Sequence, residues 1–226
     1  MEATATAPLG LHPVLAEVEA RAARQHRTVA WGAGGGTAAG RATKRGIDIL
    51  GALIGLLLTL PALLAIAVAV RMEGGPGVIF RQQRVGQHGR IFTLYKLRSL
   101  KPVADEGDVR WSIDNDSRLG RVGKFIRRTS LDELPQLFNV LFGDMSLVGP
   151  RPERPFFVEQ FSQQIPGYAL RHRVPVGLTG LAVVEGLRGD TSIPERARVD
   201  NSYADNWSLR LDIKIMLRTV RYLISH

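Results

Sequence analysis

The sequence contains no cysteine and has fewer acidic than basic residues. The missing cysteines exclude disulfide frameworks, thiolate zinc sites, iron–sulfur clusters and cysteine nucleophiles. There are 21 Asp and Glu against 30 Lys and Arg, which gives a net charge of +9, and 25 of the basic residues are arginine. This excess predicts an anionic partner, namely nucleic acid, a phosphate-bearing substrate or an acidic lipid surface. The preference for arginine favours phosphate, which a guanidinium group binds bidentately.

Length and composition predict a single folded domain with a tail. The 226 residues are 45% hydrophobic and 23% charged, which is typical of folded chains. Residues 1–43 are rich in Ala, Gly and Thr, so we expect a flexible N-terminal tail. Residues 44–72 then form a candidate membrane segment, and residues 73–226 form the main domain.

The longest uncharged segment runs from Ile49 to Val70. As a straight helix it is long enough to cross a hydrocarbon layer about 30 Å thick. Pro61 near its midpoint removes one helical hydrogen bond, and Thr59 is placed to satisfy a freed carbonyl. The segment is compatible with a re-entrant helix broken at Pro61, with a kinked spanning helix and, less well, with a buried core helix. Basic residues on both sides make both ends look cytoplasmic, and these are Lys44, Arg45, Arg71, Arg81, Arg84 and Arg90.

The rest of the chain predicts an α+β fold that is mainly α. Two short runs, Val78–Arg84 and Ile91–Arg98, surround a Gly-rich turn and predict a β-hairpin. The last helix starts near Ser208, and its basic stripe is typical of an amphipathic helix on an acidic membrane surface. The stripe consists of Arg210, Lys214, Arg218 and Arg221, opposite Leu209, Ile213, Met216, Val220 and Ile224.

Asp132 and Glu133 form the best candidate for a reactive pair, because they lie where the chain enters a helix. Ser130 and Glu133 have the spacing of a capping box, whereas Asp132 as N-cap would place Pro135 within the first turn. In either case the positive end of the helix favours the ionised form of Asp132. Such a carboxylate can be a nucleophile, a metal ligand or only a cap.

Arginines precede and follow this pair. Arg127 and Arg128 come just before it, and prolines restrict the backbone on both sides of Arg151. Acidic residues among guanidinium groups predict a diphosphate site completed by a metal, with a surface ion-pair network as the alternative. Asp114 and Asp116 form a D-x-D pattern that some metal-dependent glycosyltransferases use, and it is a secondary candidate.

Several motifs together resemble the bacterial sugar transferases, which are monotopic phosphoglycosyl transferases. The resemblance covers residues 44–223, and its most specific blocks are TSLDELPQLFNVL at 129–141 and GDMSLVGPRP at 143–152. The other matching segments are Lys44-Arg45 with Asp48, the apolar run with Pro61, Gly75-Pro76 with Phe80, Arg84-x-Gly86, Lys96-Leu97-Arg98-Ser99 and GLTGLA at 177–182.

The resemblance implies transfer of a sugar-1-phosphate from a UDP-sugar to undecaprenyl phosphate, with release of UMP. In the family the aspartate becomes a covalent phosphosugar intermediate and the glutamate assists at a magnesium site; these roles fall on Asp132 and Glu133. Mn²⁺ is an alternative to Mg²⁺. The implied place is the cytoplasmic face of the bacterial inner membrane, held by a re-entrant helix, with amphipathic interfacial helices in the catalytic domain. The predicted phosphate-binding residues are Arg127, Arg128, Arg151, Lys96 and Arg98.

The implied partners are membrane lipid, downstream glycosyltransferases of an exopolysaccharide or glycoconjugate pathway and a second copy in a homodimer, but no nucleic acid. The resemblance is to short members of the family, and it favours glucose- or galactose-type donors. Two other functions are compatible with the residues: a metal-dependent glycosyltransferase that uses Asp114 and Asp116, and a non-catalytic membrane-anchored scaffold. The departures from the family pattern affect the helix break and substrate identity, and they are Leu60, Pro175, Val176, Val183 and Glu185.

Overall fold

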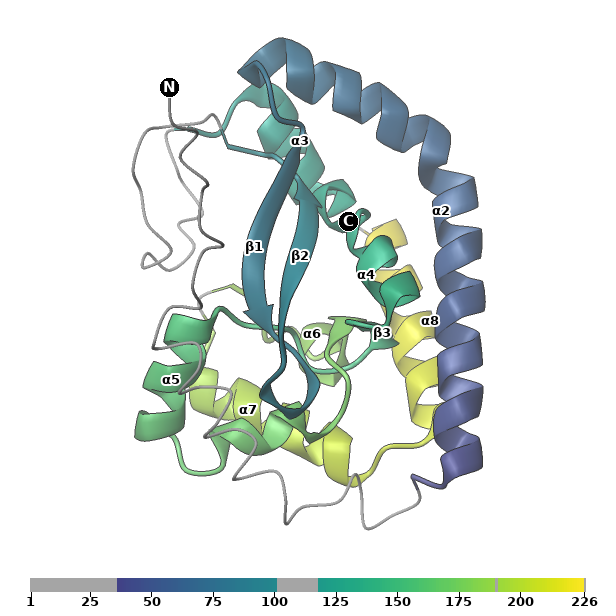
Figure 1. Cartoon of the computed structure of the whole chain (residues 1–226), viewed down its shortest axis with the longest axis vertical. Coiled ribbons are helices and arrows are strands. Elements are labelled where there is room, and N and C mark those ends of the chain that lie inside the picture. The colour runs from purple at the N-terminus through teal and green to yellow at the C-terminus, as the bar shows by residue number, and fades with distance from the viewer. Residues whose placement is uncertain (1–35, 101–117, 190, 226) are drawn as a thin grey trace, which may run out of the picture.

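The computed structural model describes residues 36–100, 118–189 and 191–225, and it is mainly helical with two small sheets (Figure 1). A long helix, α2, runs along one side of the molecule, and a β-hairpin lies beside the shorter helices (Figure 1). Asp114 and Asp116 lie outside the described residues, as does most of the predicted tail. The observed elements confirm a mainly α fold with one small antiparallel hairpin.

Helix α2 (Ala38–Gly74) is continuous through Pro61. The prediction that the helix is broken at Pro61 is therefore wrong: the helix continues past Pro61, although its axis turns in the C-terminal half (Figure 1). A proline inside a helix bends it because the ring clashes with the preceding turn. Thr59 donates to the carbonyl of Gly55 at 2.7 Å, and not to that of Leu57, which Pro61 leaves without its usual donor. The helix also includes residues 38–43, which we had assigned to the tail.

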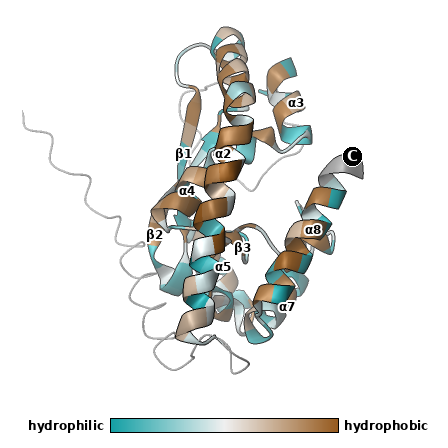
Figure 2. Ribbon diagram, turned by 90° about the vertical axis from the view of Figure 1, so that its right-hand side faces the viewer, coloured by the Kyte–Doolittle hydropathy of each residue, from teal (hydrophilic) through white to brown (hydrophobic). Residues whose placement is uncertain are grey.

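Most of the apolar surface of α2 is exposed. Leu57 and Leu58 are each 74% exposed, and only a narrow stripe of the helix is buried against the protein. The helix is long and apolar enough to cross a membrane, and just 11% of its most hydrophobic window is buried. Figure 2 shows the hydrophobic residues on the side of α2 that faces the viewer. This exposure excludes the interpretation of α2 as a buried core helix.

The N-terminal half of α2 is attached to the protein by buried polar contacts. Lys44 forms an ion pair with Asp212 at 2.7 Å, and Arg45 donates to the carbonyl of Leu141 at 2.7 Å. Asp48 accepts from the Ser146 hydroxyl and the Leu147 backbone N–H, both at 2.9 Å. The charges of Lys44 and Arg45 are therefore used inside the fold, which removes two residues from the positive-inside argument.

The predicted hairpin is present. Strands β1 (Ile79–Val85) and β2 (Ile91–Leu97) pair antiparallel around a 3-10 turn, η1 (Gln87–Gly89). Side chains of β2 alternate, so that Phe92 and Leu94 face the core. By the same alternation, Lys96 lies on the same face of the strand as Phe92 and Leu94.

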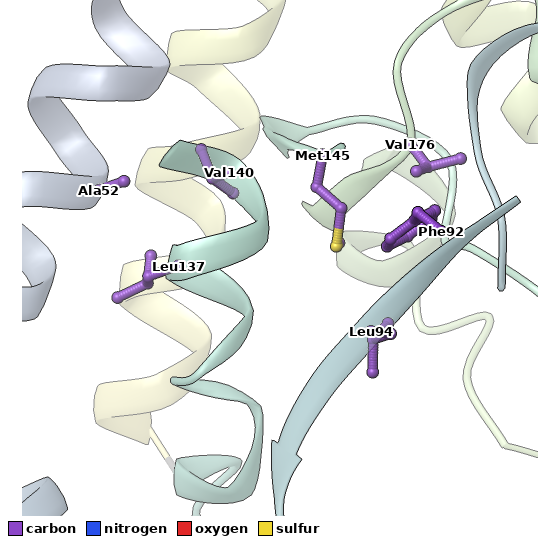
Figure 3. Close-up of a cluster of buried hydrophobic side chains, with 7 residues drawn as sticks. All are labelled: Ala52, Phe92, Leu94, Leu137, Val140, Met145 and Val176. Atoms are coloured by element: carbon purple, nitrogen blue, oxygen red, sulfur yellow. The ribbon is translucent and has the colours of Figure 1, made fainter. Parts of the chain in front are cut away.

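Three short helical segments follow: α3 (Arg121–Arg128), the 3-10 helix η2 (Leu131–Glu133) and α4 (Gln136–Phe142). Asn139 joins α4 to β2, because its amide donates to Thr93 O at 2.7 Å and accepts from Tyr95 N at 3.1 Å. Helix α4 lies between α2 and β2. The core around it, drawn in Figure 3, contains Ala52, Phe92, Leu94, Leu137, Val140, Met145 and Val176.

The C-terminal part combines a parallel strand pair with five helical segments. Strand β3 (Ser146–Val148) pairs parallel with β4 (Gly177–Thr179). Gly149 directly follows β3, and a Cβ there would collide with the Pro175 carbonyl, so a larger residue does not fit. The helical segments are α5 (Pro155–Gln164), η3 (Tyr168–Arg173), α6 (Leu181–Val184), α7 (Ile193–Asp205) and α8 (Leu209–Ser225).

Helix α8 begins after Ser208, as predicted, and the Ser208 hydroxyl accepts from Leu211 N at 3.2 Å. The predicted apolar face is partly wrong: Asp212 and Ile215 are buried, whereas Ile213 and Val220 are exposed on the same side as the basic stripe. The side chain of Ile224 lies outside the described set. The helix was misjudged because Asp212 turns inward to meet Lys44.

Candidate active site

A turn with an unusual backbone conformation at Ser130 precedes Asp132 and Glu133. Ser130, between α3 and η2, has φ 56°, a left-handed conformation that costs energy for a residue with a Cβ. Its side chain makes no capping hydrogen bond, and Pro135 holds the N-cap position of α4. Ser130 therefore holds the N-cap position of η2 without the hydrogen bonds of a capping box, and the prediction of Asp132 as N-cap is wrong. The 3-10 turn places the two acidic residues ahead of α4 and leaves them available for other contacts.

Glu133 is held by two cations. Arg151 donates to both of its carboxylate oxygens, at 3.1 Å from Nη1 to Oε2 and more closely from Nη2 to Oε1. Lys96 Nζ lies 2.9 Å from Oε1. Burial opposes ionisation here, but the charges of Arg151 and Lys96 outweigh it and hold the pKa of Glu133 well below its ordinary value. Glu133 is therefore an ionised anchor for Lys96 and Arg151.

Asp132 lies beside this cluster and is only 8% exposed. Burial raises its pKa, and the negative charge of Glu133 adds to the rise. Lys96, Arg127 and Arg151 oppose the shift without reversing it. We predicted that the helix end would favour the ionised form, and this was wrong because desolvation is the larger effect. Asp132 is thus a poorly solvated carboxyl group among cations.

The predicted cations differ in where they lie. Lys96 and Arg151 contact Glu133 directly, and burial lowers the pKa of Lys96. Arg127, at the end of α3, donates from Nε to Ser99 Oγ at 2.8 Å, and its charge acts on Asp132. Arg128 is exposed. The structure therefore brings Lys96, Arg127 and Arg151 to the acidic pair.

Arg98 serves a different purpose. It donates to the carbonyl of Gly75 at 2.8 Å and to that of Pro76, just after the end of α2. Arg98 and Lys96 are two residues apart on and after β2, so their side chains share one face but reach different elements. In this structure Arg98 therefore fixes the backbone just after the end of α2.

The segment that carries Arg151 is fixed by neighbouring strands. Gly149 N donates to Thr179 O at 2.9 Å, and Gly177 N donates to Pro150 O at 2.8 Å. The two glycine-containing motifs of the sequence, GPRP and GLTG, thus form one structural unit. This unit determines where Arg151 meets Glu133.

A layer of buried arginines lies behind Arg151, and the sequence analysis assigned no role to it. These side chains pair with Glu153 and Asp200, and only Arg84 lies in a motif that the sequence singles out, Arg84-x-Gly86. Burial lowers the pKa of Arg84 to about 10, although Glu153 opposes the shift. The layer consists of Arg84, Arg171 and Arg196.

The departures from the family pattern lie mostly in packing positions. Val176 is fully buried in the core beside Phe92, and Val183 is buried on α6. Glu185 lies 3.9 Å from Arg218 on α8. Leu60 is exposed on α2. None of these contacts involves Asp132 or Glu133, which locates the departures around the site rather than in it.

A divalent metal fits this site only in part. Among the residues that the structure describes, no group of three or more acidic or histidine side chains could hold one. Both oxygens of Glu133 are engaged by cations, so it does not offer a metal ligand in this conformation. Mg²⁺ commonly takes one or two carboxylates and completes its shell with phosphate oxygens and water. Asp132 with a bound diphosphate meets that requirement.

A buried carboxyl group beside an anionic anchor and three cations, on a domain attached to an exposed apolar helix, defines a class of protein that handles phosphates next to a membrane. The family model for bacterial sugar transferases matches residues 39–226. The chain therefore belongs to the bacterial sugar transferase family.

Named relatives have related activities. The chain is 46% identical to the UDP-glucose:undecaprenyl-phosphate glucose-1-phosphate transferase of Escherichia coli K12, over 80% of this chain and 40% of that protein. It is 44% identical to the UDP-N-acetylgalactosamine-undecaprenyl-phosphate N-acetylgalactosaminephosphotransferase of Aeromonas hydrophila, over 80% of this chain and 44% of that protein.

A third relative is more similar in length. The exopolysaccharide production protein PSS of Rhizobium leguminosarum is 38% identical, and the match covers 78% of this chain and 92% of that protein. In contrast, the chain spans less than half the length of the Escherichia coli and Aeromonas proteins. About four-fifths of this chain therefore corresponds to a part that proteins of different lengths share.

Proposed function

We propose that the protein transfers a sugar-1-phosphate from a UDP-sugar to undecaprenyl phosphate and releases UMP. The observation that carries this proposal is the ion cluster of Glu133, Lys96 and Arg151 beside the buried Asp132. The three positive charges around this poorly solvated carboxyl group, those of Lys96, Arg127 and Arg151, suit a substrate with two linked phosphates. The names of the Escherichia coli and Aeromonas relatives support the same class of donor and acceptor.

The proposed reaction has two displacements at one phosphorus. A carboxylate oxygen of Asp132 attacks the phosphorus that bears the sugar, and the bond from that phosphorus to the UMP oxygen breaks. UMP leaves with the bonding electrons. A phosphate oxygen of undecaprenyl phosphate then attacks the same phosphorus, and the bond to Asp132 breaks. Asp132 is thereby regenerated, so no other reactant is needed.

The surrounding residues supply positioning and charge. Lys96 and Arg151 are held by Glu133, and they offset the negative charge of the donor as it approaches Asp132. A magnesium ion held by Asp132 and the diphosphate would offset further charge. We assign Glu133 to ordering the two cations, because its oxygens already contact them.

We also propose that the protein lies on the cytoplasmic face of the bacterial inner membrane. The exposed apolar surface of α2 is accompanied by Phe138 and Phe142 of α4 and by Ile213 and Leu217 of α8. A bent α2 can enter and leave on one face, which would keep the acidic pair at the depth of a lipid phosphate. The natural chain has no cysteine, so topology is directly testable.

The topology experiment uses two single-cysteine variants, Ala42→Cys before the apolar segment and Gln83→Cys after it, both at exposed positions. A membrane-impermeant maleimide is applied to spheroplasts and to inverted membrane vesicles. A re-entrant helix predicts labelling of both cysteines in inverted vesicles only. Labelling of the two cysteines from opposite sides would establish a spanning helix instead.

The activity experiment measures the nucleotide product. Purified protein in detergent is incubated with undecaprenyl phosphate, Mg²⁺ and a panel of UDP-sugars that includes UDP-glucose, UDP-galactose and UDP-N-acetylgalactosamine. We expect UMP, a glucose- or galactose-type donor preference, and a phosphosugar adduct on Asp132 by mass spectrometry. UDP as the product would favour a glycosyltransferase using Asp114 and Asp116, and no product with any donor would favour a scaffold.

A further inference from the structure

The segment that presents Arg151 is poor in backbone donors. Pro150, Pro152 and Pro155 have no N–H group, so between them only three backbone donors are available. Such a segment is attached to the rest of a protein chiefly through its carbonyl oxygens. The position of Arg151 therefore depends on which groups donate to those oxygens.

Four consecutive carbonyls, from residues 150 to 153, each accept a hydrogen bond from a different place in the fold. The outer two accept from backbone N–H groups: Gly177 N to Pro150 O at 2.8 Å and Val85 N to Glu153 O at 2.9 Å. The inner two accept from arginine side chains instead. Arg171 Nη2 lies 3.0 Å from Arg151 O, and Arg84 Nη1 lies 3.0 Å from Pro152 O.

Arg171 is the more deeply buried of these two arginines, with 1% of its surface exposed. The same Nη2 atom that contacts Arg151 O also donates to Asp200 on α7 at 2.5 Å, and Nη1 donates to the Tyr168 hydroxyl at 2.9 Å. Burying an ion pair is expensive, and a neutral donor would satisfy one carbonyl at lower cost. The presence of a charged pair here is explained if Asp200 holds the planar guanidinium group of Arg171, its fork of N–H donors, rigidly against the carbonyl of residue 151.

We infer that Arg171, oriented by Asp200, is a positioning residue that places the Arg151 guanidinium on Glu133 and toward the donor diphosphate. This inference rests on the proposed function. Arg171 acts through the backbone of residue 151 and does not touch the substrate. Removing its fork lets the proline-rich segment shift, and a shift of about 1 Å at a phosphate-binding group can cost 100-fold in rate.

Arg173 provides a matched control. It lies on the same 3-10 helix, is 4% exposed and also bridges to α7, where it contacts Asp205 and the carbonyl of Asn201 at 3.0 Å. Its side chain contacts α7 and forms no hydrogen bond with residues 150–153 among the described residues. Arg171→Lys and Arg173→Lys each remove a buried guanidinium group that bridges to α7, although Asp200 is 2% exposed and Asp205 is 62% exposed. Only the first substitution loosens the segment that carries Arg151.

The first measurement compares the two variants as full-length protein in detergent, by melting temperature and by steady-state UMP release. We expect the larger loss of melting temperature in Arg171→Lys, because Asp200 is buried whereas Asp205 is mostly exposed. We expect kcat/KM for the UDP-sugar to fall by about 10- to 100-fold in Arg171→Lys and by less than about 3-fold in Arg173→Lys. Equal losses of kcat/KM in the two variants would overturn the inference.

The second measurement asks whether Arg171 acts through Arg151. Arg171→Lys is combined with Arg151→Lys, which keeps the charge and some activity. If the inference holds, adding Arg171→Lys to Arg151→Lys lowers kcat/KM by less than about 2-fold relative to Arg151→Lys alone. The same fold loss in both backgrounds would show that Arg171 acts independently, and the inference would fail.

Two further results keep the test decisive. If Arg171→Lys does not fold, Asp200→Asn replaces it, because this near-isosteric change removes the carboxylate that orients Arg171. We expect a 10-fold or larger fall in kcat/KM, and wild-type kcat/KM would overturn the inference. Wild-type protein that releases no UMP, or Arg151→Lys with full activity, would instead contradict the proposed function and its use of Arg151.

Discussion

At the residue scale, the two neighbouring carboxyl groups have opposite surroundings. Glu133 contacts Lys96 and Arg151, so its pKa is held low, whereas burial raises the pKa of Asp132. Pairs of titratable groups whose pKa values are pushed apart are typical of sites in which each group has a different role. Under the proposed function the anchor is Glu133, and the group that reacts is Asp132.

Replacing Asp132 tests this division. Asp132→Asn should abolish UMP release, with a loss of about 1000-fold or more, and should raise the melting temperature at pH 7. The folded pKa of Asp132 is raised, so its charge costs stability above the ordinary pKa of 3.8, and the neutral amide removes that cost. Calorimetry and the UMP assay measure the two effects. A variant that melted lower than wild type would contradict the assignment of Asp132 as a destabilised charge.

The raised pKa also predicts the pH dependence of the first displacement. The attacking form of Asp132 is the carboxylate, so the rate should fall as pH falls through a pKa above 3.8. A single-turnover assay of UMP release between pH 4 and 8 measures this acid limb. A rate that stayed constant down to pH 4 would show that Asp132 does not limit the step.

Replacing Glu133 tests the anchor. Glu133→Gln leaves Lys96 and Arg151 without their counter-charge. We expect the free energy of unfolding to fall by about 2–4 kcal/mol, less than for a fully buried pair because the Arg151 side chain is 37% exposed. The pKa of Glu133 is depressed, so its stabilisation is present above the ordinary value of 4.5 and is lost as pH falls below it. Melting curves of both proteins should therefore converge at acid pH, and a constant gap would argue against the ion cluster.

At the element scale, α2 has two differently used parts. Its first turns are joined to the protein by Lys44, Arg45 and Asp48, and the remainder, from Ile49 to Met72, exposes large apolar residues on both sides of Pro61. The polar contacts fix the position of the helix, and the exposed part is free to meet lipid. The attachment and the membrane contact can thus be tested separately.

The attachment depends on one buried ion pair. Lys44→Met removes a partner of Asp212, which retains hydrogen bonds from Tyr203 and Trp207. Breaking a buried pair on one side costs about 3–5 kcal/mol, so the melting temperature should fall clearly. Lys214→Met, at an exposed position on α8, is the control and should have little effect. Similar effects of both variants would indicate that the Lys44 ion pair contributes little.

The bend depends on Pro61. Pro61→Ala restores a backbone donor and removes the ring, so α2 should straighten and favour a spanning orientation. In the topology experiment, Ala42→Cys and Gln83→Cys should then be labelled from opposite faces. Unchanged labelling would show that the buried polar contacts, and not the proline, determine how the helix enters the membrane.

At the scale of the whole molecule, net charge and apolar surface make distinct predictions about association. A protein held by charge alone would leave the membrane at high salt, because exposed ion pairs are screened. The exposed apolar length of α2 should instead keep most of the protein in the membrane fraction after a wash with about 1 M NaCl. At that salt concentration charges are screened beyond roughly 3 Å. Sedimentation with immunoblotting measures the retained fraction. Release by salt would argue against burial of α2 in lipid.

The elements were largely predictable because they depend on residues that are close together in the chain. Two short runs around a Gly-rich turn indicated the hairpin, and Ser208 indicated the start of α8. The capping box failed because the pattern at Ser130 and Glu133 does not reveal the left-handed turn that precedes α4. Local spacing specified where Asp132 and Glu133 lie, but not how their side chains are used.

The sequence by itself determined a long apolar segment, a basic composition and an acidic pair between arginines, because composition and period are properties of the chain. Only the tertiary structure decided which cations meet that pair: Lys96 reaches Glu133 across 37 positions, while Arg98, two residues later, turns to the end of α2. Coulomb energy and desolvation depend on distance and burial in space, and neither can be read from separation along the chain.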